Sequence, residues 1–322
     1  MLAGESGVKD DIAQAAWLYY VGNLSQQEVS DRLGISRFKV LRMLADAREQ
    51  GLVRISVEHR TSRTLALADQ LSAAFGLEEV QVAPVSADYS ENREKYARDA
   101  VGVLAARYMA RVLSTEGPVT VGIGWGRTLS TMADHVTGVK KTDVTFVSIM
   151  GSVAHATHTA PGDVCVRLAA TTAGRAMLMP APFVTDNPDA CRTIMEQRLV
   201  KEALGTARRA DHAIMSVGEC RPGAILFESD IFTDEQKDEL QTAGVVGDCC
   251  GVFFTADGQV ADIPLNACTP CVRPSEMGGI STVMLASGER KLAATLAVLR
   301  AGFVRRLLVD EQLARALLAE TR

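Results

Sequence analysis

Apolar residues recur at helical spacing through the N-terminal part of the chain. Ser25 and Ser36 stand where helix N-caps belong, and Glu28 follows Ser25 at capping-box spacing. Gly34 and Gly51 end two of these amphipathic stretches, because glycine readily adopts the positive φ of a helix C-terminus. The pattern predicts helices over residues 10–22, 26–33 and 36–50, followed by a strand or wing over residues 52–59.

From residue 80 onward, short apolar runs alternate with amphipathic stretches of helix length. The runs predicted as strands are VQVAP, VTVGIG, VTFVSIMG, RAMLMPAP, HAIMSVG, VVGDCCGVFF, STVMLAS and RRLLVD. Helices are predicted over residues 91–113, 128–136, 189–209 and 289–301, and from residue 311. Apolar strands separated by helices indicate a doubly wound, mostly parallel α/β sheet with helices on both faces.

The change of pattern divides the chain into an N-terminal helical domain, residues 1–58, and an α/β domain, residues 80–322. Residues 59–79 carry another apolar seam at helical spacing and are predicted to form a helical connector. A length of 322 residues agrees with two domains. Apolar residues make up 47% of the chain and charged residues 23%, as in an ordinary globular protein with a sizeable core.

Residues 24–44, LSQQEVSDRLGISRFKVLRML, fit a helix-turn-helix unit, in which two short helices are joined by a turn containing glycine. The second helix of such a unit lies in the major groove of DNA, and its N-terminal residues meet the bases. The predicted DNA-contacting residues are Ser25, Gln26, Ser36, Arg37, Lys39 and Arg42. The alternative is a helical hairpin that only packs, with its charges forming a solvated face.

The third predicted helix separates apolar from basic residues. Val40, Leu41 and Leu44 are expected to face the core, which leaves the basic side chains outward, and no acidic residue occurs between Ile35 and Ala45. Phosphates are contacted by Arg, Lys and helix N-termini, so the local charge favours DNA binding. The whole chain has a net charge of -5, which argues against a protein that coats nucleic acid over its whole surface.

The sequence lacks an apolar run of membrane-spanning length and the apolar core of a signal peptide, so a cytoplasmic location is expected. The seven cysteines are interpreted as reduced, buried thiols. Cys268 and Cys271 have zinc-ligand spacing, but the adjacent Cys249 and Cys250 would point to opposite faces of a strand. His155 and His158 have no partner at ligand spacing, so neither a metal nor a cofactor is predicted.

A glycine-rich loop joins an apolar strand to a helix in VTVGIGWGRTLSTMADHV, residues 119–136. Glycine lets the backbone approach an anion, and a helix N-terminus directs N–H groups at it. Arg127 adds a charge-assisted donor and Thr128 a hydroxyl. The spacing matches neither a Walker loop nor a dinucleotide fingerprint. The loop is interpreted either as a phosphate site or as a tight strand-to-helix crossover.

Two later residues occupy comparable positions. Asp248 ends an apolar run between two glycines, and Lys291 follows Gly288 where another strand meets a helix. Ligands bind beyond the carboxyl ends of strands in an open parallel sheet, so a phosphate loop, a carboxylate for sugar hydroxyls and a lysine for a second anion could share one crevice. Alternatively, Lys291 is a solvated lysine in the first turn of a helix.

The chain resembles the SorC family of bacterial sugar-responsive transcriptional regulators nearly from end to end. IAQAAWLYYVGNLSQQEVSDRLGISRFKVLRML is similar to the DNA-binding end of that family. VGIGWGRTLS, VVGDCCGVFFTADG and GERKLAATLAVLRAGF are similar to parts of its effector domain and occur in the family order. The resemblance implies a helix-turn-helix joined to a phosphosugar-isomerase-like α/β domain. It also implies dimers or tetramers, operator DNA near a sugar or polyol operon, and an allosteric effector that is a phosphorylated sugar or polyol.

The resemblance also assigns effector-binding residues, which are Gly124, Trp125, Gly126, Arg127, Thr128, Gly151, Asp248 and Lys291. The glycine loop would bind the effector phosphate, Asp248 would bind the effector hydroxyls, and Lys291 would lie in the same pocket. Family members often carry a Gly-Gly pair where this chain has Gly151 followed by Ser152. The histidines of the following VAHATH either reach the pocket or are loop residues, and Trp125 either stacks on an effector or covers the crevice.

The sequence is also compatible with two other functions. A phosphosugar isomerase or deaminase would need an acid/base pair beside the sugar, and Asp248 with His155 or His158 is the only candidate pair. An enzyme would have little use for the N-terminal helices, so no catalytic residue is predicted. The other alternative is a DNA-binding protein with a vestigial pocket.

Overall fold

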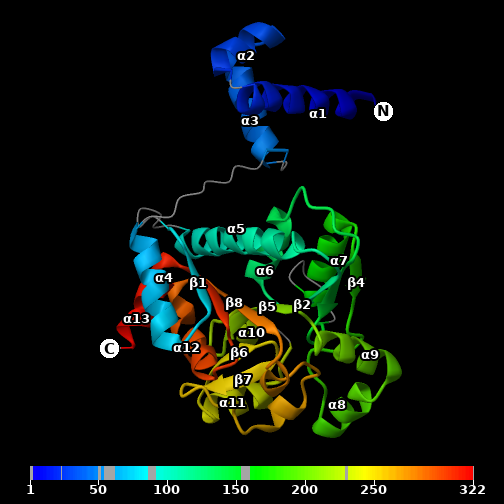
Figure 1. Cartoon of the computed structure of the whole chain (residues 1–322), viewed down its shortest axis with the longest axis vertical. Helices are drawn as coiled ribbons and strands as arrows, with labels where there is room; N and C mark the ends of the chain where they lie inside the picture. Colours follow the sequence, from blue (N-terminus) through cyan, green and yellow to red (C-terminus); the bar gives the residue numbers. More distant parts are fainter. Residues whose placement is uncertain are drawn as a thin grey trace. The chain divides into compact units, whose positions relative to one another are not determined.

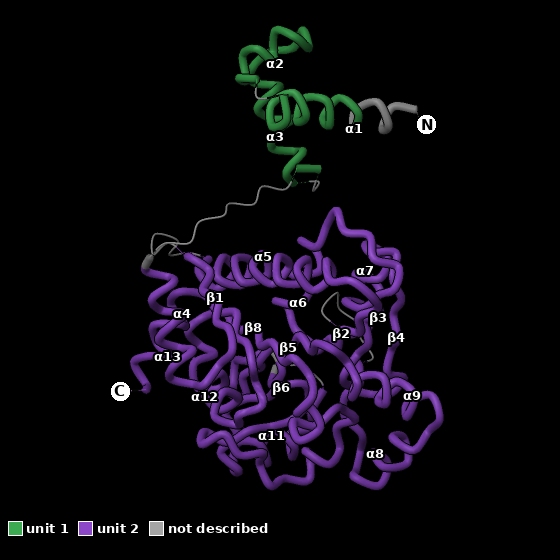
Figure 2. Tube along the Cα trace, viewed as in Figure 1, with its two compact units in different colours: residues 1–58 green, residues 59–322 purple. Residues whose placement is uncertain are grey.

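The computed structural model describes residues 3–22, 24–49, 52–53, 62–85, 92–153, 160–228 and 231–321. Contacts within the chain define two compact units, Met1–Glu58 and His59–Arg322 (Figure 2). None of the described helices is long and apolar enough to span a bilayer.

The first unit consists of helices. They are α1 (Ala3–Ala16), the π-helical turn η1 (Trp17–Val21), α2 (Gln26–Leu33) and α3 (Arg37–Glu49). Ser25 and Glu28 form the predicted capping box, and Gly34 ends α2 with a φ of 63°. The helices enclose a small core that includes Leu18 and Val29. The predicted strand or wing over residues 52–59 falls outside the described residues, apart from residues 52–53.

The prediction that Leu41 faces the core is wrong, because this side chain is 47% exposed. The buried residues of α3 are Val40, Met43, Leu44 and Ala47, which follow the i, i+3, i+4, i+7 spacing of one helix face. Leu41 is one residue further than Val40, and a helix turns by about 100° per residue. It therefore belongs to the edge of the exposed face.

The second unit is built on a mostly parallel sheet with the strand order β1-β9-β8-β5-β2-β3-β4 (Figure 1). Its strands are β1 (Glu79–Ala83), β2 (Val119–Ile123), β3 (Val144–Ser148), β4 (Arg175–Met177), β5 (His212–Glu219), β8 (Ser281–Ala286) and β9 (Arg306–Asp310). All neighbouring strands along this path are parallel. The predicted α/β fold is confirmed.

Helices cover both faces of the sheet (Figure 1). They are α4 (Ser62–Phe75), α5 (Arg93–Leu113), α6 (Arg127–His135), α7 (Pro161–Thr172), α8 (Pro188–Met195), α9 (Arg198–Ala207), α10 (Ile225–Glu228), α11 (Asp234–Thr242), α12 (Leu292–Arg300) and α13 (Glu311–Ala319), with 3-10 turns η2 (Pro264–Ala267), η3 (Pro274–Glu276) and η4 (Glu289–Lys291). On β5, Ile214 packs into the core under α5, α6 and α7, whereas Ala213 and Met215 pack into the core on the other face.

Two predicted elements have a different form in the structure, and the helices α7, α10 and α11 were not predicted. VVGDCCGVFF forms two strands of an antiparallel hairpin, β6 (Val245–Cys249) and β7 (Val252–Thr255), with β6 paired antiparallel to β5. Cys250 and Gly251 form its turn with φ values of 54° and 79°, as a two-residue hairpin connection requires. The predicted helix 189–209 is broken into α8 and α9, because Gln197 is extended.

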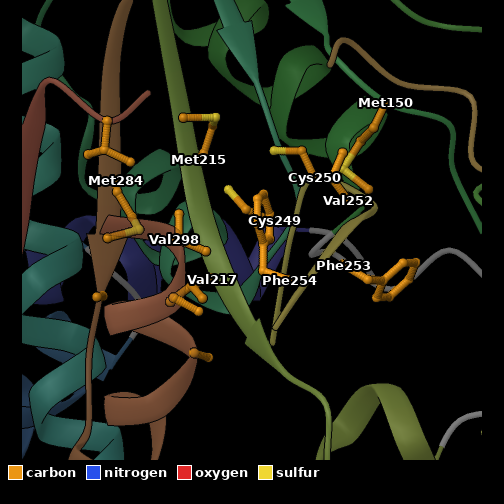
Figure 3. Packing of buried hydrophobic residues seen from close by; sticks show 14 of the residues in the cluster. Met150, Met215, Val217, Cys249, Cys250, Val252, Phe253, Phe254, Met284 and Val298 are labelled. Carbon is orange, nitrogen blue, oxygen red and sulfur yellow. The ribbon is translucent and has the colours of Figure 1, made fainter. Parts of the chain in front are cut away.

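The stretch predicted as a connector is helical and packs within the second unit, where α4 contacts α13 and β1. All seven cysteines are free and buried. Cys249 and Cys250 lie among Met215, Phe254 and other apolar side chains (Figure 3). The hydrogen bond with the neighbouring Cys249 thiol, and then burial in these apolar surroundings, raise the pKa of the Cys250 thiol.

Candidate functional site

A pocket lies beside the carboxyl ends of β2, β5 and β8, within the second unit. It has about 400 Å³ of space that is not filled by protein atoms and is partly open to solvent, and it is lined by Glu94, Arg98, Arg127, Thr128, Glu219, Ser287, Gly288, Arg290 and Lys291. The chain passes from β2 to β3 and β4 on one side, and β5, β8 and β9 lie on the other, so the pocket is at the point where the strand order reverses. Ligands of open α/β sheets bind at this position.

The pocket carries more positive than negative side chains. Four lining residues are cationic and two are carboxylates. Arg290 Nε lies 2.8 Å from a carboxylate oxygen of Glu94, and Arg221 Nη2 lies 2.8 Å from one of Glu219. Both lining carboxylates are therefore ion-paired, and a net positive charge faces the empty space. Such a pocket suits an anionic ligand.

The glycine loop places the start of α6 at this pocket. Gly126 is the residue before the helix and has a φ of 144°, a conformation that L side chains rarely adopt. A Cβ at this position would also collide with Ser216 Oγ. Ser216 holds the loop from β5, because its hydroxyl donates to Trp125 O at 2.6 Å. Gly126 is therefore required both by its backbone conformation and by the approach of β5.

Thr128 lies in the first turn of α6 and is buried. Its hydroxyl is 3.4 Å from Ser287 Oγ, which follows β8. Two hydroxyls from different strand-to-helix connections thus meet at the pocket, next to the N–H groups of a helix N-terminus. Hydroxyls beside a helix N-terminus are a donor set suited to an anion.

The connection after β8 is held by Asp310, which ends β9. One carboxylate oxygen accepts from Gly288 N at 2.7 Å, and the other caps α13 by accepting from Gln312 N and Leu313 N. Asp310 is fully buried, and this burial raises the pKa of its carboxyl despite the hydrogen bonds. Asp310 positions the loop that carries Ser287 and Lys291, although it does not line the pocket itself.

Lys291 has its ammonium in a dehydrated position. Its Nζ donates to Val217 O at 2.7 Å. Burial lowers the pKa of Lys291 to about 8, with further lowering by Arg127 and Arg98 and opposition from Glu219 and Asp248. An ammonium has three donors, so two remain for a ligand in the pocket. A lysine whose ammonium only extends into solvent would not donate to Val217 O, so that alternative does not fit the structure.

Asp248 lies on β6, opposite Gly218 of β5, and is buried. It does not line the pocket. Its carboxylate accepts from Gly251 N at 3.3 Å. Burial raises the pKa of Asp248 to about 6, while the bond from Gly251 and the charge of Lys291 act in the opposite direction. Asp248 is therefore a neighbouring charge for Lys291 in this structure.

The remaining predicted effector residues lie outside the pocket lining. Gly124 N donates to Ile214 O at 2.9 Å and continues the sheet, and the Trp125 ring packs edge-on against Phe183 at a centroid distance of 5.1 Å. Gly151 N donates to Pro270 O at 2.9 Å, and a Cβ on Gly151 would collide with Pro182 O. At Gly151 the backbone therefore passes close to two other backbone segments. His155 and His158 lie outside the described residues.

Sequence reasoning did not assign six of the lining residues to the effector site: Glu94, Arg98, Glu219, Ser287, Gly288 and Arg290. Two of them begin α5, the helix that follows β1, and three lie in the connection after β8. The rule that ligands bind beyond the carboxyl ends of strands could have identified these two connections. Glu219 directly follows the predicted strand HAIMSVG, so the same rule also points to this residue.

The predicted DNA-contacting residues gather at the starts of α2 and α3. Ser25 and Ser36 act as N-caps, since their hydroxyl oxygens accept from the backbone N–H of Glu28 and Lys39. Each hydroxyl keeps its hydrogen for donation. Arg37 Nε donates to Gln26 Oε1 at 3.3 Å and so joins the two helix starts. Within the described residues, Arg37, Lys39 and Arg42 are exposed and form no ion pair.

Known proteins share this architecture along nearly the whole chain. Residues 59–319 match the family described as "Putative sugar-binding domain". The chain is 31% identical to the erythritol catabolism regulatory protein EryD of Brucella abortus (strain 2308), over 95% of this chain and 96% of that protein. It is 29% identical to the deoxyribonucleoside regulator of Bacillus subtilis (strain 168), over 94% and 96%. The crystal structure of the full-length sorbitol operon regulator SorC from Klebsiella pneumoniae matches with a TM-score of 0.72 and 25% identity, over 97% of this chain and 99% of that one.

A helical unit of helix-turn-helix type followed by a sugar-binding α/β domain defines a class of transcriptional regulators. The chain belongs to the SorC family of bacterial sugar-responsive transcriptional regulators. The family resemblance seen in the sequence is thereby confirmed.

Proposed function

We propose that this regulator controls a sugar or polyol catabolic operon by binding operator DNA through α2 and α3. We further propose that a phosphorylated sugar or polyol binds the pocket and is its effector. The observation that carries the proposal is the pocket's donor set. Thr128 and Ser287 supply hydroxyls, α6 supplies a helix N-terminus, and Lys291 supplies a partly dehydrated ammonium. The names of the relatives, which mention erythritol, deoxyribonucleosides and sorbitol, agree with this ligand class.

An enzymatic role has less support. A sugar isomerase needs a free acid/base group beside the sugar. Asp248 does not line the pocket, and both carboxylates that line it are ion-paired with arginines. Lys291, with a pKa of about 8, is the lining group that could exchange a proton, and it has no free carboxylate in the lining as its acid/base partner. We also propose that the regulator acts as a dimer or tetramer, because helix-turn-helix proteins read two half-sites through paired recognition helices. Light scattering of the purified chain measures this state directly.

The effector proposal is tested by a thermal-shift screen of matched compounds, each phosphorylated sugar or polyol beside its unphosphorylated form. The set includes erythritol, sorbitol and deoxyribose and their phosphates. A ligand at 100 times its dissociation constant stabilises by about 2.7 kcal/mol, which raises the melting temperature by roughly 5–10 °C in a domain of this size. A response to free sugars equal to that of their phosphates would contradict the assignment.

A matched pair of variants locates the ligand. Thr128→Val removes the pocket hydroxyl while keeping the side-chain shape, and should weaken phosphate-ester binding by about 10–100-fold, the effect of one hydrogen bond to a charged group. Thr131→Val is the control on the same helix, because its hydroxyl donates to Arg127 O and does not line the pocket. Equal effects of the two substitutions would place the ligand elsewhere.

A further inference from the structure

The outward face of α3 carries a large apolar side chain, Phe38, which is not among the predicted DNA-contacting residues. Phe38 is 80% exposed, the highest value among the exposed large hydrophobic residues of the described chain. Its position on the helix is opposite the buried stripe that contains Val40 and Leu44. The ring therefore contributes nothing to the described core of the unit.

The surroundings of Phe38 identify what it meets. Arg42 follows it by one helical turn on the same face, and Arg37 and Lys39 flank it. Leu41, at i+3, is also exposed and extends the apolar surface to the side. An apolar ring surrounded by unpaired cations is poorly matched to a protein core or a membrane interior. It is well matched to the major groove, where thymine methyl groups project between phosphates.

We propose that Phe38 reads thymine, by packing its ring against the C5-methyl group of a thymine in the major groove of the operator. This proposal rests on the proposed DNA-binding function and specifies part of its sequence selectivity. The neighbouring cations hold the helix to the phosphates, while Phe38 supplies a contact that depends on the base. Position supports this role, because Phe38 is the second residue of α3 and the N-terminal residues of a recognition helix contact the bases.

The test uses the full-length chain and removes one methyl group at a time. Binding sites are first selected from random-sequence DNA duplexes. Each thymine of the selected site is then replaced by deoxyuridine, which lacks only the C5-methyl group, and affinity is measured by fluorescence anisotropy. For the wild-type chain, a single deoxyuridine at the contacted position should weaken binding by about fourfold, the effect of exposing one methylene-sized group.

Phe38→Ala should abolish the discrimination at that one position and bind the thymine and deoxyuridine duplexes equally. Leu65→Ala is the control, because Leu65 is an exposed leucine on α4 in the other unit, and this variant should keep the full discrimination. The exposure of Phe38 means that its replacement leaves the core intact, which circular dichroism and thermal melting verify.

Two results would overturn the proposal while leaving DNA binding in place. One is a selected site at which no deoxyuridine affects the wild-type chain. The other is a Phe38→Ala variant that keeps the wild-type response at every thymine, including one that binds all duplexes more weakly by a constant factor. Selection that enriches no sequence would refute the DNA-binding function itself, and the Phe38 proposal with it.

Discussion

Lys291→Met should stabilise the ligand-free protein and abolish its response to phosphate esters. Methionine keeps an unbranched stem of similar length and removes the charge. Burial lowers the pKa of Lys291 from 10.5 to about 8, so the protonated ammonium is penalised in the folded state at neutral pH. At 1.36 kcal/mol per pKa unit, this penalty is about 3 kcal/mol. The lost bond to Val217 O offsets about 1 kcal/mol, which leaves a net gain of roughly 1–2 kcal/mol.

The destabilisation by Lys291 depends on pH, because only the protonated ammonium is penalised in the folded state. Below pH 8, Lys291 is charged in both the folded and the unfolded chain, so the destabilisation of the wild type relative to Lys291→Met is complete. Between pH 8 and 10.5 the folded state releases its proton first, and the unfolded chain then binds more protons than the folded one. Wild-type stability therefore rises relative to the variant across this window, and the two curves converge.

The assay is thermal or urea unfolding of the wild type, Lys291→Met and Lys140→Met at several pH values. Lys140 is exposed and does not line the pocket, so its replacement should change neither stability nor the response to ligand. In the ligand titration, Lys291→Met should bind phosphate esters about 10–100-fold more weakly, since a hydrogen bond to a charged group contributes about 1.5–3 kcal/mol. A lower melting temperature for ligand-free Lys291→Met at pH 7 would refute the reasoning.

Further substitutions address the other parts of the molecule. Arg42→Ala should weaken binding of operator duplex and reduce the slope of log K against log salt by about 1 in anisotropy titrations, because one phosphate contact is lost. Gly126→Ala should destabilise the second unit by at least about 1–3 kcal/mol, measured by urea unfolding, because the φ of 144° suits glycine and Ser216 occupies the space of a Cβ. Residues 59–322, expressed alone, should melt cooperatively and respond to the same phosphate esters as the full chain, and an insoluble product would contradict the boundary between the units.

The parallel sheet could be predicted because its strands are buried on both faces and appear as continuous apolar runs. The same property hid the hairpin, since the apolar residues of Val245–Cys249 and Val252–Thr255 follow one another with only Gly251 and the apolar Cys250 between the two strands, and no polar turn residue marks the reversal. Cys250 adopts a φ of 54°, which residue type alone does not indicate. The break between α8 and α9 was missed for a similar reason, because neither proline nor glycine occurs at Glu196 and Gln197.

Part of the site could be predicted from the sequence. The residues that could be predicted lie in connections after parallel strands, and those that could not depend on how the chain folds elsewhere. Arg127, Thr128 and Lys291 line the pocket and lie where the connections after β2 and β8 enter the next helix or 3-10 turn, at the end of the sheet where topology alone places ligand-binding groups. Asp248 was assigned to effector hydroxyls on the assumption that its strand is parallel to the others. The structure places it on the antiparallel strand β6, beside Gly218, so whether it also touches the effector stays a prediction. Contacts that depend on hairpin geometry have no periodic signal in the sequence.

The energetics of Lys291 bear on whether the pocket is vestigial. Burial of the Lys291 ammonium, with repulsion by Arg127 and Arg98, outweighs the attraction of Glu219 and Asp248, so the protonated lysine destabilises the ligand-free fold. A methionine of the same length would remove that penalty, so the fold alone does not explain a lysine at this position. A bound phosphate would reverse the balance, because its charge compensates the cations that repel one another in the empty pocket. The lysine is therefore best explained by an anionic ligand, and a Lys291→Met variant that is more stable but unresponsive would separate this role from any contribution to folding.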